Sequence, residues 1–216
     1  WLTHDFGWNE AAGRYVDVST GRFVKFSAVR EQFEIVIERS QADMAGLSRR
    51  LQAGEISLAE WQLGMQRNIK TVHVASAAAA RGGWAQMNPS DWGWVGRECR
   101  RQYEFLDRFA RQIASGKQPL DGRFLRRAEM YGQAGRGTFE EMRRRYMRLY
   151  KGAVEERRVL GMAEHCETIG DLEGCVELAQ MGWQPVGELP RLGATPCRVN
   201  CKCGFEYRNA RREVIA

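Results

Sequence analysis

The residues most able to do chemistry gather near the C-terminus of the chain. Five of the six cysteines lie there, and His165 stands beside the first of them; the five are Cys166, Cys175, Cys197, Cys201 and Cys203. Thiolate and imidazole groups are the usual ligands of structural, tetrahedral Zn²⁺. The spacing is not that of two Cys-x-x-Cys pairs, so it does not select four ligands. We prefer Cys166, Cys175 and Cys201, with Cys197 or Cys203 as the fourth ligand.

The segment between these cysteines explains why a cross-link is expected. Residues 182–190 are rich in turn formers and too poor in apolar side chains to fold unaided. Zinc binding contributes roughly 10–16 kcal/mol of folding free energy in small peptides. Disulfides between Cys166 or Cys175 and one of the three later cysteines are an alternative, and free buried thiols are another. A redox-active pair is disfavoured, because Cys201 and Cys203 have one residue between them and no thioredoxin-like context.

Arginine dominates the basic residues and is concentrated in one stretch. The net charge is +6, and residues 121–160 hold eleven basic and six acidic side chains. Arginine forms bidentate contacts with phosphate or carboxylate groups. The stretch therefore predicts a surface for nucleic acid or an acidic partner, with a solvated or ion-paired helix face as the alternative. Its candidate contact residues are Arg143, Arg144, Arg145 and Arg148.

Candidates for catalysis are scarce. No Ser-His-Asp set or paired carboxylates stand out, and the chain has three histidines. His73 and Cys99 fall within helical patterns, where such residues usually belong to the core. Residues 132–137 superficially resemble a phosphate-binding loop, but no hydrophobic strand precedes them and the Gly-Lys-Ser/Thr ending is missing. We expect no enzymatic activity.

The elements that must position these residues are mainly helices. A 3.6-residue apolar period predicts a helix from Ser27 to a stop at Gly54. Ser57 and Glu60 form a capping-box pattern that begins a second helix. Asn88-Pro89 begins a third, which ends near Gly116. A fourth helix is expected over 121–131. A fifth is expected from Thr138, as its cap, to Tyr150.

The N-terminal residues instead predict an arm. Residues 15–18 and 22–24 have the pattern of two strands joined by a turn. Such a hairpin is marginal alone. Trp1, Phe6, Trp8 and Tyr15 give it apolar area, and a partner subunit could supply the surface that covers this area.

Together these patterns predict a mainly α protein with three parts. Residues 1–26 form an extended aromatic arm with a short β-hairpin, residues 27–160 a body of four to five helices, and residues 161–216 a small Cys-rich turn/β element that is cross-linked or binds zinc. No stretch approaches the roughly 18 apolar residues of a membrane span, and no secretory signal is expected.

The C-terminal motifs resemble those of a known family. His165-Cys166, the run Gly174–Leu178, the run Gly182–Pro185, Leu189-Pro190 and the run Cys197–Cys203 are similar to the C-terminal region of the phage head-morphogenesis family, the Mu F-like minor head proteins. Cys201 and Cys203 match the family's closing Cys-x-Cys. Cys166 and Cys175 match its first pair, with eight intervening residues in place of two, and Cys197 stands where the family has a histidine.

The resemblance implies a structural virion protein rather than an enzyme. Members are minor capsid components that act near the portal during head assembly and DNA packaging. We therefore expect portal or major capsid protein as partner, a large homo- or hetero-oligomeric assembly, possible non-specific DNA contact, and location in the virion and, during assembly, the host cytoplasm. The alternatives are a zinc-dependent, non-sequence-specific nucleic-acid-binding protein and, third, a nuclease or toxin.

Overall fold

The computed structural model describes residues 6–9, 11–161 and 166–215. The chain divides into two compact units, Trp1–Gly135 and Arg136–Ala216. This division differs from the expected boundary after residue 160, because the helix predicted from Thr138 belongs to the C-terminal unit. Trp1 and His165 lie outside the described residues.

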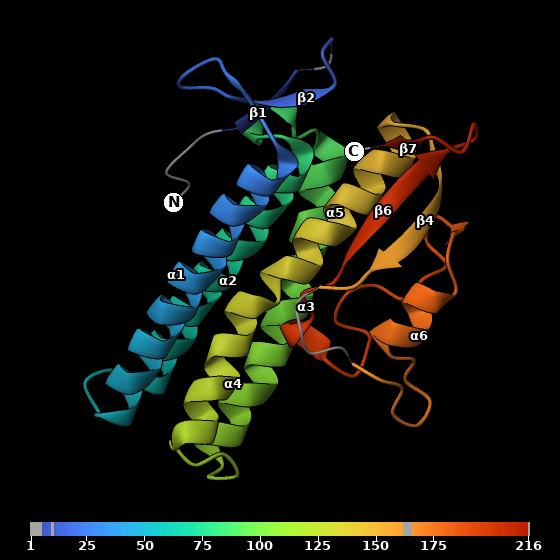
Figure 1. The fold of residues 1–216 in the computed structure, drawn as a ribbon. Coiled ribbons are helices and arrows are strands. Elements are labelled where there is room, and N and C mark those ends of the chain that lie inside the picture. Colours follow the sequence, from blue (N-terminus) through green and yellow to red (C-terminus); the bar gives the residue numbers. More distant parts are fainter. Residues whose placement is uncertain (1–5, 10, 162–165, 216) are drawn as a thin grey trace. The chain divides into compact units, whose positions relative to one another are not determined.

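Four long helices form most of the N-terminal unit (Figure 1), and the expected mainly α class is confirmed. Helix α1 packs on α2 and α4, and α2 packs on α3. Among the described residues, no helix combines the length and apolarity needed to cross a membrane. The helices are α1 (Phe26–Gln52), α2 (Leu58–Arg81), α3 (Pro89–Ala114) and α4 (Gly122–Gln133), with a short 3₁₀ turn, η1 (Trp84–Gln86), before α3.

The helix ends follow the expected capping chemistry. The Ser57 hydroxyl accepts the Glu60 backbone N–H, and the Glu60 carboxylate accepts that of Ser57. Asn88 and Asp91 repeat this reciprocal arrangement at the start of α3. Each pair satisfies two backbone donors that a helix N-terminus leaves free. Both predicted helix starts are confirmed.

An aromatic cluster forms the core of this unit. Trp61 is fully buried, and its ring meets Phe109 edge-on at 5.4 Å and Phe124 at 5.7 Å. The Trp61 indole N–H donates to the Ser48 hydroxyl at 3.0 Å, so its one polar atom is satisfied. Because these residues come from α2, α3 and α4, their burial fixes three helices at once.

The arm is a three-stranded antiparallel sheet of β1 (Phe6–Asn9), β2 (Arg14–Asp17) and β3 (Phe23–Val24). The expected hairpin corresponds to β2 and β3, and β1 is an additional strand. The expectation that a partner subunit covers the arm needs correction for Phe6, Trp8 and Tyr15, which are buried in this chain. A Cβ at Gly83 would lie 2.3 Å from the Phe6 carbonyl oxygen, so glycine there allows close approach.

The fifth helix starts earlier than its expected cap at Thr138, within the glycine-containing residues 132–137. Helix α5 (Gly135–Tyr150) begins directly after α4, so Thr138 lies inside it and is not its cap. The glycines have a packing role instead. A Cβ on Gly135 would lie 2.6 Å from Ile37 Cδ1 and 2.9 Å from the Ser76 hydroxyl.

The C-terminal unit contains a four-stranded antiparallel sheet in the order β5-β4-β6-β7. The central pair places Glu156 opposite Tyr207 and Arg158 opposite Phe205. Helix α5 belongs to the same unit. The other elements are β4 (Ala153–Val159), α6 (Cys175–Gln180), β5 (Gln184–Pro185), η2 (Arg198–Asn200), β6 (Gly204–Asn209) and β7 (Val214–Ile215).

Burial makes His73 a source of pH dependence in the N-terminal unit. The side chain is 1% exposed, and desolvation lowers its pKa from 6.5 to about 4. Between these values the unfolded chain binds a proton that the folded chain does not, so stability falls as the pH falls. From pH 7.5 to 5.0 this linkage removes about 2 kcal/mol.

The measurement is urea unfolding of the wild-type chain and of His73→Gln at both pH values. We expect the variant to lose about 2 kcal/mol less than the wild type on acidification, because glutamine does not titrate. Equal losses in the two proteins would contradict the linkage to His73.

Candidate metal centre

Different elements of the C-terminal unit bring its five cysteines together. Cys175 is the first residue of α6, Cys197 precedes η2, and Cys201 and Cys203 lie just before β6. Close packing places Cys166 against the start of α6, because a Cβ on Gly174 would lie 2.5 Å from the Cys166 carbonyl oxygen. Cys175, Cys201 and Cys203 are buried, whereas Cys166 and Cys197 are partly exposed.

Cys175 stands at the centre of the thiols. Its sulfur belongs to two groups within which all ligand atoms lie within 4.8 Å of one another: one with Cys201 and Cys203, the other with Cys166 and Cys197. The Cys175 and Cys201 sulfurs are 3.7 Å apart. Two sulfurs at about 2.3 Å from a tetrahedral ion lie about 3.8 Å apart. The cluster can therefore hold a metal ion.

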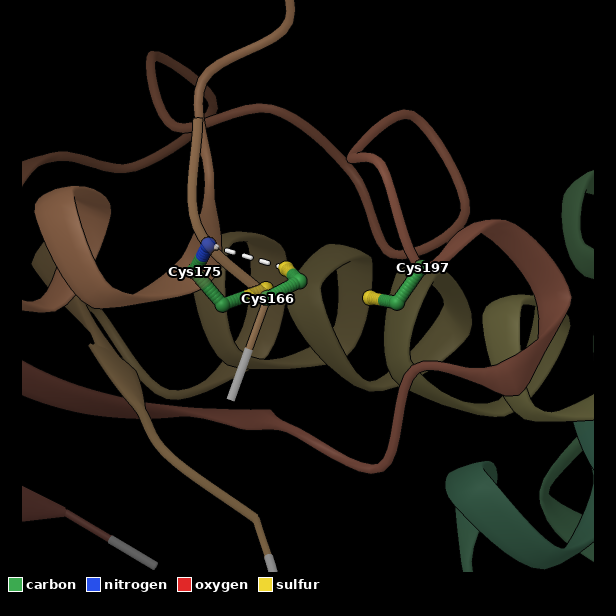
Figure 2. Close-up of side chains that lie close together, drawn as sticks. All are labelled: Cys166, Cys175 and Cys197. Atoms are coloured by element: carbon green, nitrogen blue, oxygen red, sulfur yellow. Dashed lines mark hydrogen bonds between the residues drawn. The ribbon is translucent and has the colours of Figure 1, made fainter. Parts of the chain in front are cut away.

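The second group has its own hydrogen bonds. The Cys175 backbone N–H donates to the Cys166 sulfur at 3.1 Å, and the Cys197 sulfur points toward the other two (Figure 2). The Thr195 hydroxyl lies 3.3 Å from the Cys197 sulfur and accepts from the Cys175 thiol at 3.7 Å. Thr195 is 1% exposed and thus connects Cys197 with Cys175 inside the unit.

Crowding separates the pKa values of the thiols. Hydrogen bonds from the Cys175 and Cys201 thiols, with a smaller contribution from the Arg158 charge, hold the pKa of Cys203 well below its usual range. Hydrogen bonds with Cys201 and Cys203, followed by desolvation, raise the pKa of Cys175. The Cys203 thiol therefore ionises more readily than an ordinary thiol. Metal binding would displace the protons that remain on the others.

The expected ligands all lie in this cluster, although the grouping differs from the preferred set. Cys201 and Cys203 share a compact group with Cys175, and Cys166 lies in the other group. All six cysteines are free thiols. The 3.7 Å between Cys175 and Cys201 is far beyond a disulfide bond of about 2.05 Å. Cys99, the sixth, is buried in α3 of the N-terminal unit.

The four candidate arginines occupy different environments on α5. Arg143 and Arg144 are buried, Arg145 is partly buried, and Arg148 is exposed. Arg143 donates to the Phe205 carbonyl oxygen at 2.9 Å. The guanidinium groups of Arg143 and Arg144 are thus occupied within the fold, and Arg148 is the exposed member of the set.

Arg144 joins α5 to the sheet and to the turn-rich segment. Its Nε lies 2.9 Å from a carboxylate oxygen of Glu156, which has no exposed surface. Burial raises the pKa of Glu156, although the Arg144 charge opposes this. Arg144 also donates to the Leu189 carbonyl oxygen at 3.1 Å. The other oxygen of Glu156 accepts the Gly187 backbone N–H at 3.1 Å.

Arg158 provides a second anchor for the same segment. It is 2% exposed, donates to the Pro190 carbonyl oxygen, and lies 4.4 Å from the centroid of the Phe205 ring. Sequence analysis missed Arg158 and Thr195. Thr195 lies two residues before Cys197, and this closeness to a candidate ligand is a signal that the sequence offered. Arg158 lies in a run of charged residues, and nothing in the sequence sets it apart from its neighbours.

No family model matches the chain, and no curated protein or solved structure gives a significant match. The resemblance to phage head-morphogenesis proteins therefore stays a prediction that depends on the residues quoted for it.

Removal of Arg144 should destabilise the C-terminal unit far more than removal of its exposed neighbour. Arg144→Leu leaves the Glu156 carboxylate buried without its ion pair, a defect that typically costs about 3–5 kcal/mol. Arg148→Leu changes an exposed side chain on the same helix and should stay within about 0.5 kcal/mol of wild type. Amide hydrogen exchange of β4 and β6 measures the change in stability of the C-terminal unit in each of the two variants. Similar effects of the two substitutions would show that the buried pair has no special role.

Proposed function

We propose that the thiol cluster binds one structural zinc ion through Cys175, Cys197, Cys201 and Cys203. Thiolates favour zinc over hard cations such as magnesium and calcium. Burial of Cys175, Cys201 and Cys203 suits a closed site, in which protein ligands fill all four positions and no position is left for substrate. The ion would then stabilise the fold rather than catalyse a reaction.

Two observations favour Cys197 over Cys166 as the fourth ligand. Cys197 lies on the same short segment as Cys201 and Cys203, with only η2 between them. The Thr195 hydroxyl also lies against both the Cys197 and the Cys175 sulfurs. Cys166 would then remain a free thiol beside the centre.

Metal analysis tests this ligand set. We expect one zinc per chain in the purified, reduced protein, and the same content in Cys166→Ala and in Cys99→Ala, which removes a buried cysteine outside the cluster. Cys175→Ala and Cys203→Ala should lose the zinc during dialysis against a weak chelator. Circular dichroism of the N-terminal helices serves as the folding control.

Two results would contradict the zinc proposal. One is retention of zinc by Cys175→Ala and Cys203→Ala. The other is wild-type protein without metal and with fewer than six reactive thiols, which would favour disulfides. If Cys166→Ala lost its zinc and Cys197→Ala kept it, the fourth ligand would be Cys166 and not Cys197.

We propose that the protein is a minor structural component of a phage head, which contacts portal or major capsid protein. The observation that carries the proposal is that separate motifs of the resemblance meet in one structural unit. Cys166 and Cys175 lie in the same thiol cluster as Cys201 and Cys203, and Leu189-Pro190 provides the carbonyl groups bound by Arg144 and Arg158. These contacts give the cysteine motifs and Leu189-Pro190 a structural role.

The size of the species that contains the protein tests this role. In a density gradient of material from its natural source, we expect the protein to sediment with large, DNA-containing particles. The chain expressed alone, of 24.7 kDa, should sediment slowly and is the matched control. Slow sedimentation in the natural material as well would contradict a role in the virion, whatever the metal content.

A further inference from the structure

The exposed side of α3 carries a line of arginines that sequence analysis did not single out. We call Arg97, Arg100, Arg108 and Arg111 the α3 arginine face; all four are exposed. Their spacing of three, eight and three residues keeps them on one side of a helix with 3.6 residues per turn. At 1.5 Å per residue, the line from Arg97 to Arg111 is about 21 Å long.

Acidic residues compensate this face only in part. Glu98 pairs with Arg101 at 3.0 Å, and Asp107 accepts a hydrogen bond from Gln62 at 2.5 Å. Asp91 is buried and pairs with Arg81 at 2.8 Å. Glu104 and Asp107 are exposed and fall at helical positions among the four arginines, so they offset two of the four positive charges. The face therefore has an excess of positive charge and attracts a polyanion.

Flat aromatic side chains lie along the same helix. Trp84, before α3, and Trp92, in its first turns, are 45% and 40% exposed, and their rings stack with centroids 5.8 Å apart and planes 24° apart. Phe105 is 41% exposed, and the Arg108 guanidinium lies 4.8 Å from its ring centroid. Large aromatic rings are costly to expose, and these three flank the arginine line.

Two glycines leave the helix surface open between the tryptophans and the arginines. A Cβ on Gly96 would meet nothing within 4 Å, and one on Gly93 would meet only the Arg97 guanidinium at 4.0 Å. Each glycine inside a helix costs about 1 kcal/mol relative to alanine. Packing within the described chain does not require them. A ligand that approaches the helix backbone closely would use this open surface.

We propose that the α3 arginine face, with Trp84, Trp92 and Phe105, binds single-stranded nucleic acid. Arginines along the helix contact successive phosphates, and unstacked bases lie on the exposed aromatic rings. Such binding has little sequence preference, because every base has a flat face. The site depends neither on zinc nor on a role in a phage head, since all its residues lie in the N-terminal unit.

The aromatic residues favour a single strand over a duplex. In a duplex the bases are stacked on each other, so only the phosphates would meet this face. The three exposed rings would then contribute nothing to the binding of a duplex. Flexible single-stranded ends and loops present both the phosphates and the base faces.

Fluorescence anisotropy of a labelled 20-nucleotide oligo(dT) with the full chain tests the proposal at about 50–200 mM salt. We expect Trp92→Ala to weaken binding about fivefold or more, because stacking contributes about 1–3 kcal/mol per base. Arg97→Gln/Arg100→Gln should weaken binding and lower the slope of log affinity against log salt by about 1.4, which corresponds to two phosphates.

The matched control is Arg49→Gln/Arg50→Gln, which removes the same charge from exposed residues at the end of α1. We expect it to bind nearly as the wild type does. Equal weakening by both double variants would overturn the site, because net charge alone would then explain binding. A matched duplex that binds as tightly as oligo(dT), with no effect of Trp92→Ala, would overturn the single-strand assignment. Wild-type affinity in all variants would mean that the oligonucleotide binds elsewhere on the chain, and would likewise overturn the proposal.

Discussion

The buried ion pair between Arg144 and Glu156 is the interaction on which the C-terminal unit depends. Neither charge can be left alone in the interior, because an isolated buried charge costs several kcal/mol. The pair joins α5 to β4, and each partner also binds the backbone of the turn-rich segment, at Leu189 and Gly187. One polar contact thus holds a helix, a strand and a loop that has few apolar residues of its own.

The two units are stabilised by different kinds of interaction. In the N-terminal unit, apolar burial around Trp61 draws α2, α3 and α4 together, and the polar atom of that ring is satisfied by Ser48. In the C-terminal unit, β4 has charged residues on both faces. Glu156 and Arg158 are buried, and Arg157 pairs with Glu206 at 2.6 Å on the other face. In a unit of this kind a buried charge that loses its partner is costly, so the pairs restrict how the elements can pack.

These differences explain what the sequence could predict. Ser57 with Glu60 and Asn88 with Asp91 are local signals, so the helix starts followed from residues three positions apart. Strand β4 reads Ala-Val-Glu-Glu-Arg-Arg-Val, in which no apolar alternation marks the buried face. Its charged side chains are buried only because α5 and β6 supply partners from distant positions. The thiol cluster lay between these cases: its members were predictable, but the grouping around Cys175 depends on how the loops fold.

The same distinction applies to arginine, whose role is set by its position on a helix rather than by local charge density. The densest arginine run, on α5, has Arg143 and Arg144 directed into the fold, because three consecutive positions span more than half of a helical turn. On α3 the arginines recur at helical intervals instead, so Arg97 and Arg111 share an exposed side. Net charge along the sequence therefore points to the helix on which two of the four candidate arginines are buried. Helical period, applied to the charged residues as it is to apolar ones, separates arginines that hold the fold from arginines that face solvent.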